Sequence, residues 1–204
     1  LKNCATEPEI KDLINFLKKL GCKIKSFGRK IVIIGKSSKI ENINHKIIFD
    51  RIEGGTFLIA GALIGRKLII KNIEPKILKF LINLLKRMGV RIITTKKSIT
   101  ILKSTKLKSI GISTKPFPGF PTDLQAQLMV LMTQVRGVSK IKENIFENRF
   151  MHVPELKRMG AQIEIRNKTA YIKGPSKLNG AEVMATDLRA SVSLVLALSL
   201  IHIS

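Results

Sequence analysis

LKRMGVRI, residues 85–92, decides the fold because close copies of it occur twice more, as LKKLGCKI at residues 17–24 and LKRMGAQI at residues 156–163. All three follow the plan L-K-[KR]-[LM]-G-x-x-I. Their glycines lie 68 and 71 residues apart, a spacing longer than that of a solenoid repeat. The pattern therefore predicts three larger, related structural units.

Each copy has the pattern of an amphipathic helix that a glycine ends, with basic residues in the last turn, where the helix dipole favours them. Pro8 and Pro75 suit the first position of the first two helices. Pro154 lies within the last two turns of the third, so we expect there either a short helix or a kinked helix that begins near Asn148 as N-cap. Short runs of alternating β-branched residues follow each glycine and predict pairs of strands.

A second class of helix is nearly apolar along its whole length, which predicts burial. Its members are DRIEGGTFLIAGALIG at 50–65, PTDLQAQLMVLMTQVRG at 121–137 and ATDLRASVSLVLAL at 185–198. Gly54, Gly55, Gly61 and Gly65 do not spell G-x-G-x-x-G, so they favour close helix packing over a dinucleotide-binding loop. The unit of buried helix, strand, amphipathic helix and further strands predicts an α/β fold in which sheets flank central helices.

The charge is strongly basic, with 37 Lys and Arg against 14 Asp and Glu and a net charge of +23. Such a charge raises nucleic acid, an anionic membrane or an anionic ligand as partners. Lys, Ile and Asn recur along the whole chain, which favours a bias of the coding sequence. One Tyr, no Trp and scattered Phe supply no stacking platform for bases. We therefore expect neither a nucleic-acid nor a membrane partner, and keep a basic nucleic-acid-binding protein as an alternative.

Cys4 and Cys22 have no Cys-x-x-Cys spacing, and the three histidines match no metal-site spacing. We expect reduced, buried thiols, no metal and no cofactor. The longest uncharged stretch near the end, residues 190–204, is shorter than the ~20 apolar residues of a membrane-spanning helix. We expect a soluble, cytoplasmic protein, and the Leu at position 1 predicts a cut N-terminus.

The three apolar helices begin alike, with Asp50 in FDR, Asp123 in PTD and Asp187 in ATD. Thr122 and Thr186 are natural N-caps, which places Asp123 and Asp187 in the first turn. Capping alone would account for both acids. If the repeats are related by pseudo-symmetry, however, the helix N-termini converge and form a site for an anionic substrate. The acids there could then act as a general base or accept a hydroxyl group's hydrogen bond.

Three motifs are more specific: PFPGFPTDLQAQ at 116–127, IFENRFMHVPELKRMGA at 145–161 and GAEVMATDLRASVSLVLA at 180–197. They closely resemble the UDP-N-acetylglucosamine enolpyruvyl transferase (1-carboxyvinyltransferase) family, and the similarity extends from residue 1 to about residue 197. A sister family that acts on shikimate 3-phosphate shares the fold and the chemistry. It lacks FENRFMHVPEL, so we rank it well below.

The resemblance implies an inside-out α/β barrel fold of two domains, each built from three copies of a repeated unit. It places residues 1–46 at the end of the first domain and residues 47–197 in most of the second, so the barrel is expected to be incomplete. The family continues after SLVLA with a Gly-containing turn. We therefore expect residues 198–204, LSLIHIS, to be a non-native tail.

The reaction implied by the resemblance transfers enolpyruvyl from phosphoenolpyruvate to the 3′-hydroxyl of UDP-N-acetylglucosamine, the first committed step of peptidoglycan synthesis. By position, Asp123 matches the acid that hydrogen-bonds this hydroxyl and is the candidate base. Ile145 matches a backbone contact to the nucleotide sugar, and Asp187 matches the acid near the reacting centre. Phe146 and Arg149 line the same region. The expected ligands are UDP-N-acetylglucosamine and phosphoenolpyruvate.

Several groups that the family uses on phosphoenolpyruvate fall outside this sequence. The reactive Cys of the family lies in a loop that contains neither Cys4 nor Cys22, and the Lys and Arg residues that hold phosphoenolpyruvate are not matched. We therefore expect the piece to be inactive alone. An incomplete barrel also exposes apolar helix faces, so we expect the piece to be poorly soluble. A non-catalytic UDP-sugar-binding relative, which would keep Asp123 and Ile145, is an alternative.

Overall fold

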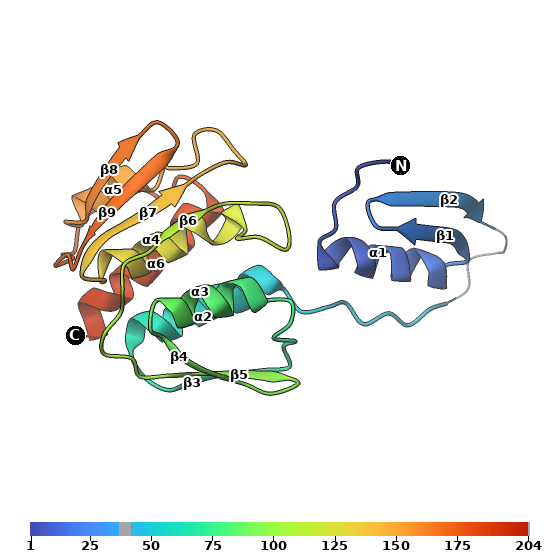
Figure 1. Ribbon diagram of the computed structural model, residues 1–204, viewed down its shortest axis with the longest axis horizontal. Coiled ribbons are helices and arrows are strands. Elements are labelled where there is room, and N and C mark those ends of the chain that lie inside the picture. Colours follow the sequence, from blue (N-terminus) through green and yellow to red (C-terminus); the bar gives the residue numbers. More distant parts are fainter. Residues whose placement is uncertain (37–41, 204) are drawn as a thin grey trace. The chain divides into compact units, whose positions relative to one another are not determined.

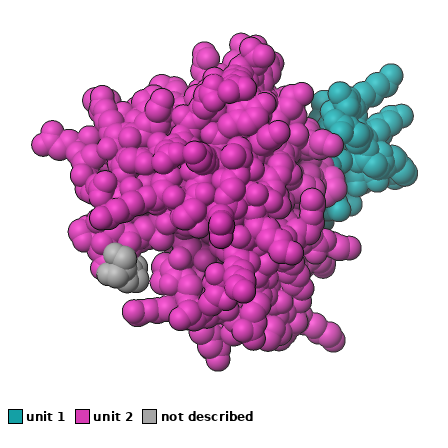
Figure 2. Space-filling model, turned by 60° about the vertical axis from the view of Figure 1, so that its left-hand side comes forward, with its two compact units in different colours: residues 1–49 teal, residues 50–204 magenta. Residues whose placement is uncertain are grey.

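The computed structural model describes residues 1–36 and 42–203, and the chain divides into two compact units (Figure 1). Unit 1 comprises Leu1–Phe49 and unit 2 comprises Asp50–Ser204; Figure 2 shows them in separate colours. The predicted domain boundary after Lys46 concerns a longer two-domain protein and stays a prediction.

Unit 1 contains helix α1 (Pro8–Lys19) and an antiparallel hairpin of β1 (Cys22–Phe27) and β2 (Lys30–Lys36). Pro8 begins the helix, as predicted, because its fixed φ suits that position and its missing N–H is not needed there. Cys4 and Cys22 are unpaired thiols, but both are half-buried rather than buried.

Three helices form the centre of unit 2: α2 (Arg51–Ile64), α4 (Gln125–Thr133) and α6 (Leu188–Ile203). A 3₁₀ turn, η1 (Thr122–Leu124), leads into α4. The three helices contact one another, and every residue of α4 is buried. The predicted burial is thus complete for α4 and partial for α6, where Val195 is 64% exposed.

Within residues 50–203, two sheets flank these helices (Figure 1). The first has the order β3-β5-β4 and is antiparallel; its strands are β3 (Leu68–Lys71), β5 (Ser98–Leu102) and β4 (Arg91–Thr94). The second has the order β6-β7-β9-β8; its strands are β6 (Gly111–Ser113), β7 (Gly137–Lys142), β9 (Thr169–Gly174) and β8 (Gln162–Arg166). Its β6–β7 pair is parallel, whereas the other two pairs are antiparallel.

Helices α3 (Lys79–Arg87) and α5 (Val153–Arg158) are the amphipathic helices of the second and third repeats. Alternate residues of β5 and β9 are fully buried, among them Ile99, Ile101 and Ile172. Apolar helices therefore lie between sheets, as the sequence predicts. In the described part of the chain the sheets do not close into a barrel, in agreement with the expected incomplete fold.

The repeated glycine ends each amphipathic helix in the same way. Gly21, Gly89 and Gly160 have φ of 90°, 100° and 99°, a left-handed conformation that costs a residue without Cβ nothing. The N–H groups of Val90 and Ala161 bond back to carbonyls five residues earlier, as in the Schellman motif.

The prediction that Pro75 occupies the first position of a helix was wrong, and the structure decides between the two helices predicted around Pro154. Pro75 is the first residue of a turn over residues 75–78, and α3 begins only at Lys79. The third copy adopts the short-helix alternative: α5 spans six residues with Pro154 in its first turn. Asn148 is no helix cap, since its φ of 54° places it in a left-handed turn.

Gly55 allows the closest approach between α2 and the start of α4. A Cβ there would lie 2.5 Å from Leu124 Cδ1 and 3.2 Å from Leu81 Cδ2. Leu124 is fully buried, so its side chain is confined by its neighbours. The predicted packing role of the α2 glycines is confirmed at this position.

Candidate active site

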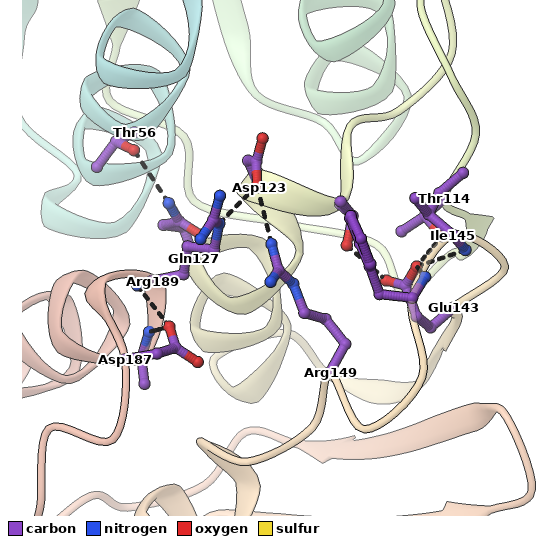
Figure 3. Close-up of polar contacts among 12 residues, drawn as sticks. Thr56, Thr114, Asp123, Gln127, Glu143, Ile145, Arg149, Asp187 and Arg189 are labelled. Carbon is purple, nitrogen blue, oxygen red and sulfur yellow. Dashed lines mark hydrogen bonds and ion pairs between the residues drawn. The ribbon is translucent and has the colours of Figure 1, made fainter.

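Asp123 is the meeting point of three segments that are distant in sequence. Its Oδ1 atom accepts hydrogen bonds from Arg149 Nη2 at 2.9 Å and from Arg189 Nε at 2.5 Å (Figure 3). Asp123 lies in η1, Arg149 in the loop after β7, and Arg189 in the first turn of α6. The starts of α4 and α6 therefore converge on one carboxylate oxygen, while Oδ2 stays outside both ion pairs.

Asp187 has a different environment, because it caps α6. Its Oδ1 accepts the backbone N–H groups of Arg189 at 2.7 Å and Ala190 at 2.9 Å. The bond from Ala190 is the largest cause of a lowered pKa of Asp187; the Arg189 N–H and the nearby Arg149 and Arg189 charges act in the same direction, against desolvation. The Oδ2 atom takes no part in the cap.

The predicted N-caps Thr122 and Thr186 were wrong. Thr122 donates its hydroxyl to Glu143 Oε2 at 2.9 Å, and its side chain makes no cap bond within the described residues. Helix α6 begins one residue later than expected, at Leu188, so Asp187 is itself the cap. Asp50 caps α2 in the same manner, by accepting the N–H groups of Ile52 and Glu53.

The loop after β7 carries the other predicted residues. The Ile145 N–H donates to Glu143 Oε1 at 2.8 Å, and the side chain of Ile145 is 36% exposed. The exposed ring of Phe146 lies 5.1 Å from the guanidinium carbon of Arg149, a cation–π contact. This loop, with Ile165, Asn167 and Lys168, lines an open pocket of about 690 Å³ that does not include Asp123 or Asp187.

His152 lies next to this site and is almost completely buried. Desolvation by burial lowers its pKa from 6.5 to about 4; the Asp187 charge opposes the shift, and the Arg149 charge adds to it. Its Nε2 atom is buried and has no hydrogen-bond partner among the residues described. His152 is therefore a neutral core histidine at neutral pH.

A family model for EPSP synthase (3-phosphoshikimate 1-carboxyvinyltransferase) matches residues 1–201. The chain belongs to the EPSP synthase family of enolpyruvyl transferases. This match confirms the predicted enolpyruvyl transferase fold, and the curated relatives that follow confirm the resemblance seen in the three sequence motifs.

Curated relatives within this family agree over nearly the whole chain. UDP-N-acetylglucosamine 1-carboxyvinyltransferases of Pelagibacter ubique and Halothermothrix orenii are 54% and 50% identical over 97% of this chain. The match covers 47% of each, so the chain spans about half the length of the curated relatives it matches.

Solved structures of the family agree as well. The enolpyruvyl transferase NikO from Streptomyces tendae superposes with a TM-score of 0.88 at 28% identity, covering 98% of this chain and 48% of that chain. An EPSP synthase from Acinetobacter baumannii, with a TM-score of 0.64 at 21% identity, shares the fold.

Two residues of this candidate site were missed by the sequence analysis. Arg189 did not stand out because it is one of 37 basic residues. Its position two residues after Asp187 in the ATDLR motif could have indicated it. Glu143 had no signal of its own, because its partners come from three separate segments.

Within residues 1–36 and 42–203, no cluster of three or more His, Cys, Asp or Glu residues is placed to hold a metal ion. Among the same residues, no helix is both long and apolar enough to cross a membrane.

Proposed function

We propose that this chain is part of a UDP-N-acetylglucosamine 1-carboxyvinyltransferase. Such an enzyme moves the enolpyruvyl group of phosphoenolpyruvate to the 3′-hydroxyl of UDP-N-acetylglucosamine and releases phosphate. The observation that carries the proposal is the shared name of five curated relatives that are 48–54% identical over 97% of this chain. In a cell, this reaction would take place in the cytoplasm and supply a precursor of peptidoglycan. Peptidoglycan maintains cell shape and is needed for cell division.

Asp123 is the proposed base. Both arginines contact Oδ1, so Oδ2 is free to accept the hydrogen bond of the sugar hydroxyl. As the hydroxyl oxygen bonds to the enolpyruvyl carbon, its proton passes to this carboxylate and phosphate leaves. Arg149 and Arg189 hold the carboxylate in place for that transfer.

The remaining candidate residues surround this carboxylate. Asp187 retains its helix cap through Oδ1 and would present Oδ2 toward the reacting centre. The exposed ring of Phe146, stacked on Arg149, suits the nucleotide sugar, and Ile145 would contact it through its backbone. In this proposal residues 1–46 close the first domain of the enzyme, residues 47–197 form most of the second, and residues 198–204 are not native.

The test begins with the source DNA, sequenced across both ends of the reading frame. The protein of the complete reading frame is then expressed and mixed with phosphoenolpyruvate and UDP-N-acetylglucosamine. We expect phosphate release that requires the UDP-sugar. Release with shikimate 3-phosphate instead would assign the chain to the sister activity, and UDP-sugar binding without turnover would make it a non-catalytic relative.

A further inference from the structure

Glu143 is a buried carboxylate, only 2% exposed, at the end of β7. Within the described part of the chain, four groups donate hydrogen bonds to it (Figure 3). Oε1 accepts from Thr114 Oγ1 at 2.7 Å and from the N–H groups of Ile145 and Phe146 at 2.8 and 3.2 Å. Oε2 accepts from Thr122 Oγ1 at 2.9 Å. An ionised carboxylate can only accept, so these donors suit its charged form and offset the cost of its burial.

These donors belong to three segments that are separate in the sequence. Thr114 follows β6, Thr122 opens η1, and residues 144–149 form the loop after β7. Because β6 and β7 are parallel neighbours, their carboxyl ends meet at one edge of the sheet. Thr114 extends the connection, since its hydroxyl also accepts the N–H of Asn144 at 2.8 Å.

The Glu143 side chain binds a neighbour of each residue of the Asp123–Arg149 ion pair. Thr122 is the residue directly before Asp123, and Phe146 stacks on Arg149. Removing the Glu143 carboxylate would take away the hydrogen bonds that hold Thr122 and the loop to one side chain, and the Asp123–Arg149 ion pair would then hold these two segments without that support. We propose that Glu143 is the positioning residue of this site, which fixes the nucleotide-sugar loop against the segment that carries the candidate base. This inference rests on the proposed function.

The test uses the protein of the complete reading frame with Glu143→Ala and Glu143→Gln. Hydrogen exchange reports the Ile145 and Phe146 amides, and steady-state kinetics report KM for UDP-N-acetylglucosamine and kcat. In the alanine variant we expect exchange of both amides to accelerate about tenfold or more and KM to rise about tenfold, as befits hydrogen bonds to a charged group. The glutamine variant should recover most of both losses, because its amide oxygen can still accept the two N–H groups.

Two milder variants separate the two halves of the connection and carry the test if the alanine variant does not fold. Thr114→Val removes the loop's anchor and should raise KM, whereas Thr122→Val loosens the segment next to Asp123 and should lower kcat. Glu164→Gln, which removes an exposed carboxylate on β8, is the matched control and should change neither quantity. A merely structural role would not divide KM from kcat in this way.

The outcomes are distinct. Unchanged exchange and unchanged kinetics in the Glu143 and threonine variants would overturn the inference while the transferase activity stands. A glutamine variant as impaired as the alanine variant would also overturn it, because the hydrogen bonds would then not be what matters. A wild-type protein without turnover would remove the proposed function, and the exchange of Ile145 and Phe146 would still decide whether Glu143 holds the loop.

Discussion

The starts of α4 and α6 carry nearly the same sequence, PTDL and ATDL, and the two aspartates nevertheless have different partners. Helix α6 starts directly after Asp187, whose side chain turns back to cap it. Helix α4 is entered through a 3₁₀ turn, and the Asp123 side chain extends to Arg149 and Arg189. The geometry of the helix start, rather than the motif, decides whether such an acid serves the backbone or the site.

The largest effect should follow from Asp123→Asn in the protein of the complete reading frame. The amide cannot take the proton of the sugar hydroxyl, so we expect phosphate release to fall about a thousandfold, within the usual range for a general base. Asp50→Asn, at a helix cap outside the site, is the matched control and should leave turnover unchanged. An Asp123→Asn enzyme with near-normal turnover would break the contrast between the two acids.

The next effect concerns His152, which lies close enough to Asp187 and Arg149 for both charges to affect its pKa. The unfolded chain binds a proton near pH 6.5, whereas folded His152 resists protonation until about pH 4. The free energy of unfolding thus keeps the full contribution of neutral His152 above pH 6.5. It falls by up to about 3 kcal/mol as the pH falls toward 4. Denaturant unfolding at a series of pH values measures this loss.

His152→Gln supplies the control for that experiment, because glutamine does not titrate. The slope of stability against pH between 6.5 and 4 should be much smaller in this variant. An equal slope in both proteins would assign the acid sensitivity to other groups. The lowered pKa of Asp187 makes its own contribution disappear only at still lower pH.

A smaller effect distinguishes the cap from the charge at Asp187. Asp187→Ala removes the acceptor for two backbone N–H groups and should lower the free energy of unfolding by about 1 kcal/mol. Asp187→Asn should lose much less, since asparagine is an equally good N-cap. Asp50→Ala should match Asp187→Ala, and equal losses for alanine and asparagine at position 187 would contradict the capping role.

The smallest effect is expected at an acid that has an arginine partner but no buried surroundings. Glu164 accepts two bonds from Arg166, at 2.7 and 2.9 Å, on an exposed part of β8. The hydrogen bonds from Arg166, together with its charge, lower the pKa of Glu164. Water and salt screen this pair, so Glu164→Gln should not change the thermal midpoint measurably. A clear shift of the thermal midpoint would show that an arginine partner stabilises the fold even where the acid is exposed.

Much of the fold was predictable because it depends on local patterns. The repeated glycine located the ends of α1, α3 and α5, and apolar runs located α2, α4 and α6. Turn geometry was not predictable to the same degree: Pro75 opens a turn before α3, and Asn148 takes a positive φ. In both cases the sequence contained an acceptable helix signal that the neighbouring turn overrides.

The site was predictable only where its residues lie in recognisable motifs. Asp123, Arg149 and Asp187 were proposed in this way, but the pairing of Asp123 with Arg189 joins residues 66 positions apart. No local pattern encodes such a contact. Glu143 is a stronger example, because its role depends on where β6 and β7 end in space.

The close approach at Gly55 makes this site vulnerable to a change far from it in sequence. A single added methyl group would press on Leu124, the neighbour of Asp123, from a helix that carries none of the candidate residues. The size of the residue at position 55 is therefore limited by the space between two helical segments, not by chemistry. In a library of random variants, position 55 should tolerate large side chains poorly, although its helix carries none of the candidate residues.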